Sequence, residues 1–251
     1  RGEERRDLDD LRPDVKAAAL PNLSVVGIDC HIGSQIIEIA PFLAALDRIL
    51  ALVDQLAAAG IRLQHLDLGG GLGIRYSDET PPTPADLMQA LFARIEQWSP
   101  GEPPEVLFEF GRALVGNAGL LLTRTEYLKR NGEKLFAVVD AAMNDLLRPA
   151  LYQAYHRIEA VRPPDRPPRR CDVVGPVCES GDWLGRDRML AIDAGDLLAI
   201  LSAGAYGAVM SSNYNSRPRA AEVLIGRGTV TVIRARETVA SLFSNESRLP
   251  D

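Results

Sequence analysis

The chain has 251 residues, of which 46% are hydrophobic and 25% are charged, and its formal net charge is -6. This length and composition indicate a globular protein with one large or two ordinary domains. The negative charge argues against a nucleic-acid or anionic-membrane partner, and no apolar run approaches the roughly 20 residues of a membrane span.

Two features bear on the compartment and on metal binding. Residues 1–10 are highly charged and contain no apolar stretch that would serve as a secretory signal. The cysteines Cys30, Cys171 and Cys178 are odd in number and lack metal-ligand spacing. We therefore expect a reducing cytoplasm and predict no metal site.

The first half of the chain repeats one pattern, in which a short apolar strand leads into glycine or polar residues and then into a helix. Leu23–Ile28 is the first predicted strand, and a helix is predicted to begin near Pro41, which suits a first helical position. Gly60 is well placed to end this helix. The residues expected on its buried face are Phe42, Leu46, Ile49, Val53 and Leu56.

Two further units follow the same pattern. Leu63–Leu68 is the second predicted strand, and it runs directly into a glycine-rich turn. Thr83 suits the N-cap of the next helix. Val106–Glu109 is the third predicted strand. The buried stripe expected on the helix between these strands consists of Leu87, Leu91 and Ile95.

Strands separated by helices indicate parallel pairing with helical crossovers. Such proteins place their chemistry in the loops after the carboxyl ends of the strands, where all three polar clusters of this half fall. Three units alone cannot close an eight-stranded barrel.

The second half has the pattern of antiparallel β structure. Leu120–Leu128 and Lys134–Val139 flank the turn signal Asn131-Gly132, and Glu222–Ile225 and Thr229–Ile233 flank a second glycine turn, so two hairpins are predicted. Asp196–Ser202 is one more predicted strand. Arg162–Arg170, with four prolines and four arginines, is expected to be a solvated surface loop whose positive charge stands alone.

The glycine run Gly69-Gly70-Gly71-Leu72-Gly73 follows the second strand. Consecutive glycines let backbone N–H groups approach an anion without Cβ clashes, so the run fits a phosphate cradle. It equally fits a tight strand-to-helix turn, and it matches neither the P-loop nor the dinucleotide fingerprint.

Two pairs of polar residues accompany the other strands. His31 would stack on an aromatic cofactor while Ser34 donates to a phosphate, or His31 is a structural histidine. Glu109 would hold a pyridinium nitrogen and Arg112 an anion, or the two form an ordinary ion pair.

Six motifs then resemble one family in their order along the chain. The chain is similar to the pyridoxal phosphate (PLP) decarboxylases of the alanine-racemase-like fold, and within that group to the diaminopimelate decarboxylases. The motifs are GIDCHIGSQ from Gly27, DLGGGLGI from Asp67, EFGRALVGNAG from Glu109, DAAMNDLLRPALY from Asp140, GPVCESGD from Gly175 and GAYG from Gly204.

The resemblance implies a fold and a domain division. The expected fold class is α/β, a partial (β/α)8 barrel that lacks several N-terminal strands, plus a mainly antiparallel C-terminal β domain. The barrel part would be residues 1–115 and the β domain residues 116–251, with the boundary between Arg112 and Gly119.

The resemblance also implies cofactor contacts. His31 would stack on the pyridine ring and Glu109 would pair with its nitrogen. The phosphate would be held by residues from both halves of the chain. These are Ser34, Gly70, Gly71, the backbone of Phe110, Gly111 and Arg112, and Tyr206.

The substrate contacts follow in the same way. The resemblance implies that Arg112, Arg148, Tyr152 and Tyr206 surround the substrate, with the first three binding the carboxylate that is not lost. Glu179 would recognise the distal ammonium. Cys178 would donate the proton after carbon dioxide leaves, acting across the interface of a homodimer.

The chain departs from the family at two places. The lysine that carries the cofactor has no counterpart, since Lys16, Lys129 and Lys134 all stand in other contexts, so we expect a fragment, a truncated product or part of a longer polypeptide. Phe110 replaces the proline typical of the family, which puts the aim of Glu109 and Arg112 in question.

The expected activity is PLP-dependent decarboxylation of meso-2,6-diaminopimelate to L-lysine, by a cytoplasmic homodimeric carboxy-lyase. The alternatives are a non-catalytic remnant or dimer partner of a full-length decarboxylase, and a decarboxylase of another basic amino acid. Glu179 after Cys178 favours the diaminopimelate enzymes, because ornithine decarboxylases usually have aspartate there.

Overall fold

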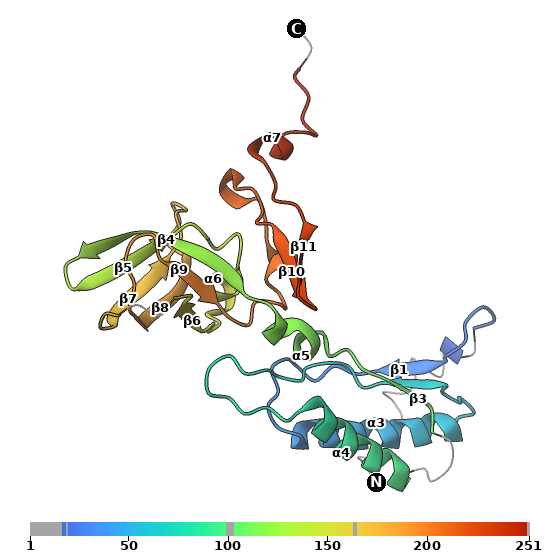
Figure 1. Cartoon of the computed structure of the whole chain (residues 1–251). Helices are drawn as coiled ribbons and strands as arrows, with labels where there is room; N and C mark the ends of the chain where they lie inside the picture. Colours follow the sequence, from blue (N-terminus) through green and yellow to red (C-terminus); the bar gives the residue numbers. More distant parts are fainter. Residues whose placement is uncertain (1–16, 19, 99–102, 163–164, 250–251) are drawn as a thin grey trace. The chain divides into compact units, whose positions relative to one another are not determined.

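The structure is a computed structural model that describes residues 17–18, 20–98, 103–162 and 165–249 (Figure 1). It divides into two compact units. The first runs to Ile74 and resumes over Glu79–Ala113, and the second comprises Arg75–Asp78 and everything from Leu114 onward. No helix among the described residues has the length and apolar character needed to cross a membrane.

The first unit contains a three-stranded parallel sheet in the order β1-β2-β3, with a helix in each crossover. The three strands are shorter than predicted, because only three residues of each form ladder pairs. Residues before β1 stay outside the ladder, although the Val26 carbonyl accepts from the amides of Gln64 and His65. The elements are β1 (Gly27–Asp29), α3 (Ala40–Ala58), β2 (His65–Asp67), α4 (Pro84–Trp98) and β3 (Glu105–Leu107).

The two helices bury the stripes that their sequences predict, with one exception. The core face of α3 includes Leu50, whereas the predicted Ile49 is only partly buried. The helix stops where Gly60 takes a φ of 84°. At the start of α4 the Thr83 hydroxyl accepts from the Asp86 amide at 3.2 Å, as expected of an N-cap. Leu87, Leu91 and Ile95 are buried as predicted.

The second unit is built on a six-stranded sheet in the order β6-β9-β4-β5-β7-β8, antiparallel except for the β5–β7 pair. Its long strand β4 pairs with β9 through its first four residues and with β5 through its remainder. The chain passes from the first unit to the second within α5 (Gly111–Val115). The elements that follow are β4 (Leu121–Asn131), β5 (Lys134–Val139), α6 (Arg148–Tyr152), β6 (Ile158–Ala160), β7 (Arg169–Val174), β8 (Trp183–Leu190) and β9 (Leu197–Ile200).

Both predicted hairpins are present. In the β4–β5 hairpin, Asn131 pairs with Lys134, and Gly132 takes a φ of 55° in the two-residue loop. The second hairpin, β10 (Glu222–Gly226) with β11 (Thr229–Arg234), forms a separate two-stranded sheet. Short 3-10 turns occur at residues 116–118, 208–210 and 214–216, and the last described element is α7 (Val239–Leu242).

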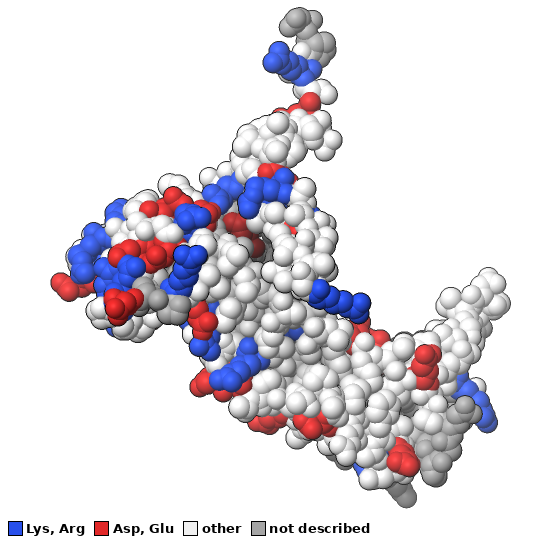
Figure 2. Space-filling view, viewed as in Figure 1, with Lys and Arg blue, Asp and Glu red and all other residues white. Residues whose placement is uncertain are grey.

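The arginine-rich segment Arg162–Arg170 differs from its prediction. Arg166 pairs with Asp193, and Arg170 at the start of β7 pairs with Asp187. The prediction of a lone positive charge is therefore wrong, because acidic residues in β8 and in the loop after it pair with Arg166 and Arg170. Figure 2 shows basic and acidic side chains intermingled over the six-stranded sheet.

Candidate functional site

The loops that leave β1, β2 and β3 lie side by side at the carboxyl edge of the parallel sheet. The Cys30 amide donates to the Asp67 carbonyl at 3.1 Å, and the Glu109 amide donates to the Gly69 carbonyl at 2.8 Å. The Ile36 amide donates to the Gly71 carbonyl at 2.9 Å. The structure thus brings together all three polar clusters found in the first half of the sequence.

The glycine run is shaped by this close approach. Gly69 and Gly71 take φ angles of 68° and 96°, which favour glycine. A Cβ at Gly70 would meet the carbonyl oxygen of Glu109, so a side chain there would push the loops apart. The Gly70 and Gly71 amides make no hydrogen bond to another described residue. Two unpaired amides in a tight turn suit an anion.

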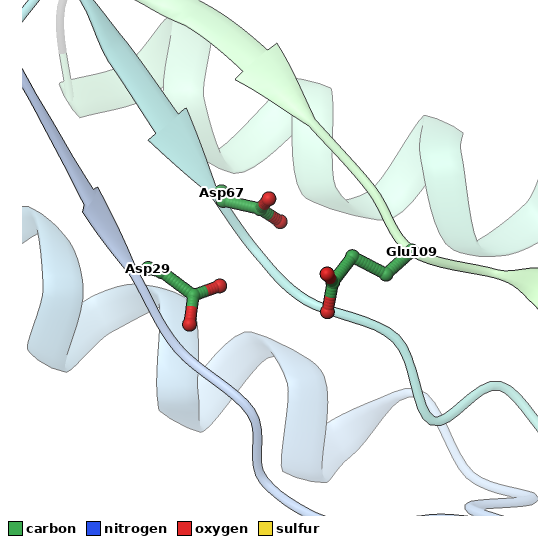
Figure 3. A group of neighbouring side chains, drawn as sticks. All are labelled: Asp29, Asp67 and Glu109. Atoms are coloured by element: carbon green, nitrogen blue, oxygen red, sulfur yellow. The ribbon is translucent and has the colours of Figure 1, made fainter.

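Three carboxylates meet at the same edge. Asp29, Asp67 and Glu109 end or follow the three strands, and their nearest oxygens all lie within 4.8 Å of one another (Figure 3). The Asp67 carboxylate also accepts from the Gly69 amide at 2.8 Å. Their mutual repulsion is relieved by any cation placed among them, whether a metal ion or a protonated ring nitrogen.

The pKa of the Cys30 thiol is raised at this edge of the sheet. Burial raises the pKa of its thiol, and the nearby charges of Asp29 and Asp67 raise that pKa further. The electrostatic potential is therefore negative close to the ends of the strands, beside the Gly70 and Gly71 amides.

The remaining predicted contacts of the first unit lie around this edge. His31 and Ser34 are exposed in the loop after β1. Phe110 stacks on Phe108, with ring centroids 5.1 Å apart, and packs against the core. This packing accounts for an aromatic residue in place of the proline. Gly111 starts α5, and its amide donates to the Glu109 carbonyl at 2.9 Å, with Arg112 following in the helix.

In the second unit, Arg148 is buried rather than open to solvent, with 9% of its surface exposed. Its Nη1 lies 2.8 Å from Nε2 of His156, and its Cζ lies 4.8 Å from the centroid of the Tyr76 ring. Tyr152, four residues later at the end of α6, is exposed. Sequence reasoning found Arg148 and missed the two residues that pack against it.

Cys178 and Glu179 lie exposed in the loop between β7 and β8. The buried carboxylate of Asp182 accepts from the Met143 and Val177 amides, both at 2.7 Å. Burial raises the pKa of Asp182, although these two backbone bonds oppose the rise. Asp182 thereby ties the Cys178 loop to the segment after β5, a role that its place in the GPVCESGD motif did not reveal.

Tyr206 is 40% exposed and holds a left-handed φ of 59°, which is costly for a residue with a side chain. Lys129 and Lys134 are exposed on β4 and β5 of the second unit, and Lys16 lies outside the described residues. No described lysine therefore lies in a strand of the parallel sheet.

Comparisons with known proteins identify the family. Residues 14–204 match the C-terminal sheet domain of the pyridoxal-dependent decarboxylases. The diaminopimelate decarboxylase of Pseudomonas aeruginosa is 58% identical over 235 residues, which cover 94% of this chain and 56% of that protein. That of Vibrio cholerae is 53% identical, with 94% and 56% covered.

The solved structures agree. Diaminopimelate decarboxylase from M. jannaschii, in co-complex with L-lysine, superposes with a TM-score of 0.91 at 38% identity, covering 96% of this chain and 56% of that one. The predicted fold class, α/β with a partial (β/α)8 barrel and a mainly antiparallel β domain, is confirmed.

The chain spans little more than half the length of the relatives that it matches. With a family match across most of its length and the same folded units as its solved relatives, the chain belongs to the pyridoxal-dependent decarboxylases.

Proposed function

We propose that the native protein, as its own gene encodes it, decarboxylates meso-2,6-diaminopimelate to L-lysine and carbon dioxide with pyridoxal 5'-phosphate as cofactor. This would be the last step of lysine biosynthesis. The observation that carries the proposal is the meeting of the glycine run with the Glu109 loop, where two unpaired amides lie beside a cluster of carboxylates.

These residues fit the cofactor's two ends. The Gly70 and Gly71 amides, with Ser34, the backbone of Phe110 and Gly111, and Tyr206, would hold the phosphate. Glu109 would accept a hydrogen bond from the ring nitrogen and favour its cationic form, and His31 would cover the ring. When bound, the cofactor supplies an electron sink for the bond pair left by carbon dioxide.

The chain's other residues would handle the substrate. Arg112, Arg148 and Tyr152 would bind the carboxylate that stays, and Glu179 would bind the distal ammonium. Cys178 would deliver a proton to the carbon that has lost carbon dioxide. A cationic and an anionic contact at the distal carbon, which bears both the retained carboxylate and the second ammonium, favour diaminopimelate over ornithine, which has no second carboxylate.

The direct test is an assay of the native protein with cofactor and meso-diaminopimelate, L-ornithine, L-lysine or L-arginine. We expect L-lysine and carbon dioxide from diaminopimelate, with Glu109→Gln reducing kcat on the order of 100-fold. Faster turnover of another basic amino acid would reassign the substrate. If the protein turned over none of the four amino acids, the alternative that it is a non-catalytic remnant would be favoured.

The position of the cofactor-linked lysine can be tested separately. Borohydride reduction of the loaded native protein, followed by peptide mass spectrometry, identifies any lysine joined to the cofactor. Labelling of Lys16, Lys129 or Lys134 would refute the expectation that the lysine lies outside this sequence.

We further propose that the native protein is a cytoplasmic homodimer in which Cys178 and Glu179 complete the partner's site. Their exposure at the tip of a loop supports this, and the absence of a disulfide among Cys30, Cys171 and Cys178 supports a reducing compartment. Mixing Glu109→Gln and Cys178→Ala proteins should restore about a quarter of the native activity if sites are shared between subunits. Cell fractionation tests the location.

A further inference from the structure

A fully buried histidine, His156, lies between Arg148 and the end of β9. Its Nε2 is 2.8 Å from Nη1 of Arg148, and its Nδ1 is 2.9 Å from the carbonyl oxygen of Leu201. One ring nitrogen therefore faces a group that only donates hydrogen bonds, and the other faces a group that only accepts them. These two contacts indicate which ring nitrogen carries the proton.

The two contacts select one neutral tautomer. A guanidinium only donates hydrogen bonds, so Nε2 must be the acceptor and carry no proton. A carbonyl only accepts, so Nδ1 must carry the hydrogen and donate to Leu201. A protonated imidazolium would turn an N–H and a positive charge toward Arg148, and the contact would be lost.

Tyr76 restrains the same guanidinium from a second direction. Its ring centroid lies 4.8 Å from Cζ of Arg148, in cation–π range, and its ring meets the His156 ring edge-on at 5.2 Å with an interplanar angle of 80°. Tyr76 is 7% exposed, so the packing is shielded from water. Arg148 is thus held by a hydrogen bond at Nη1 and by an aromatic surface.

A reversal of the chain after α6 places His156 beside Arg148. The chain turns back after α6 through Gln153, whose φ is 53°, and enters β6 two residues after His156. Because Ile158 pairs with Ile200 in the antiparallel β6–β9 ladder, His156 comes opposite the residues that follow Ile200, which include Leu201. Histidine and arginine eight positions apart are brought together by this reversal.

We propose that His156 is a positioning residue, which orients the Arg148 guanidinium toward the carboxylate that the substrate keeps. This inference rests on the proposed function, because it takes diaminopimelate as the substrate. His156 itself touches neither substrate nor cofactor.

Two substitutions of His156 separate its two hydrogen bonds. His156→Gln places an amide oxygen near the site of Nε2 and keeps the acceptor for Arg148. His156→Asn places an amide N–H near the site of Nδ1 and keeps the bond to Leu201, but removes the acceptor for Arg148. Both variants replace the buried ring by an amide, and asparagine is one methylene smaller than glutamine, so a comparison of inhibitors with and without the carboxylate separates lost packing from lost orientation.

In the native protein we expect His156→Asn to raise KM for meso-diaminopimelate about tenfold, with kcat changed much less, because uniform substrate binding is weakened. The inhibition constant of L-lysine, which retains that carboxylate, should rise in parallel. The inhibition constant of 1,5-diaminopentane, which has no carboxylate, should stay unchanged. His156→Gln should restore KM close to the wild-type value.

Equal effects of Asn and Gln, or an equal rise for 1,5-diaminopentane, would overturn the proposal and leave His156 a packing residue. A ¹⁵N NMR spectrum of the wild-type chain gives a test independent of activity and of variant folding: a proton on Nε2 would refute it. Failure of the wild type to use diaminopimelate would instead count against the proposed function, and the inference would fall with its substrate.

Discussion

The carboxylate of Asp182 accepts a hydrogen bond from the Val177 amide at 2.7 Å, one residue before Cys178. Its other oxygen accepts from the Met143 amide, and its own amide donates to the Glu179 carbonyl at 3.0 Å. One buried side chain therefore determines the conformation of the loop that presents both proposed functional residues.

Asp182→Ala should loosen this loop. Two partly buried amides lose their acceptor, which costs on the order of 1 kcal/mol each in the free energy of unfolding. Hydrogen exchange should quicken at Val177 and Met143, and urea unfolding should show the lost stability. Asp47→Ala is the control, since its exposed ion pair with Arg94 contributes little and alanine suits its position within α3. Unchanged exchange at Val177 would contradict the role given to Asp182.

Asp145 predicts a pH dependence of stability. Burial raises its pKa above the ordinary 3.8, and the bonds from the Ala142 amide and from Arg217 offset this only in part. Because the folded state holds this proton more tightly than the unfolded state, stability should fall as pH rises from about 3.8 through the raised pKa.

Asp145→Asn, which does not ionise, should lack that component of the pH dependence. Unfolding free energies of both proteins at several pH values from 3 to 7 check the prediction. The stability of wild type minus variant should decrease with rising pH, and an increase would show that the Arg217 interaction outweighs burial.

The cysteines should differ sharply in reactivity. Burial raises the pKa of Cys171 to about 11, with the Asp172 charge adding to the rise. At pH 8 only about one Cys171 thiol in a thousand would then be ionised, and the side chain is enclosed, whereas Cys178 is exposed. A disulfide reagent should react rapidly with Cys178, and Cys178→Ser should remove the fast phase. A fast phase at Cys171 would disprove the assignment.

Gly70→Ala and Gly111→Ala are matched substitutions at the carboxyl edge of the parallel sheet. Gly70→Ala should cost about 1–3 kcal/mol of stability, because its Cβ would meet the Glu109 carbonyl oxygen. Gly111→Ala should be tolerated, since nothing lies within 4 Å of its Cβ position. Urea unfolding compares the two, and equal costs would argue against close packing of the glycine run on the Glu109 loop.

Features set by nearby residues were predictable from the sequence. The N-cap at Thr83, the stop at Gly60 and both hairpin turns depend on a few consecutive residues, and the structure contains each of them. The strand lengths were not predictable, because the β1–β2 ladder begins only at Gly27, opposite the first residue of β2, and the apolar run Leu23–Val26 before it carries no sign of that limit.

The site shows the same division. The residues around the glycine run were found because parallel strands bring their following loops to one edge. The contact of Arg148 with His156 was missed because it depends on the left-handed turn at Gln153 and on the register of β6 with β9. The neutralisation of Arg166 and Arg170 was missed for a similar reason, since their acidic partners are 17 or more positions away.

The divided pairing of β4 links the two halves of the second unit mechanically. Its segment Leu121–Arg124 pairs with β9, and the residue after β9, Leu201, contacts His156. Its segment from Thr125 onward pairs with β5, which pairs with β7, and the loop after β7 contains Cys178. A displacement at the buried residues Thr123 and Thr125 would be transmitted along one continuous backbone in both directions. The Arg148 cluster and the Cys178 loop are thus coupled through β4, and the contacts of α6 and β6 with β8 couple them a second time.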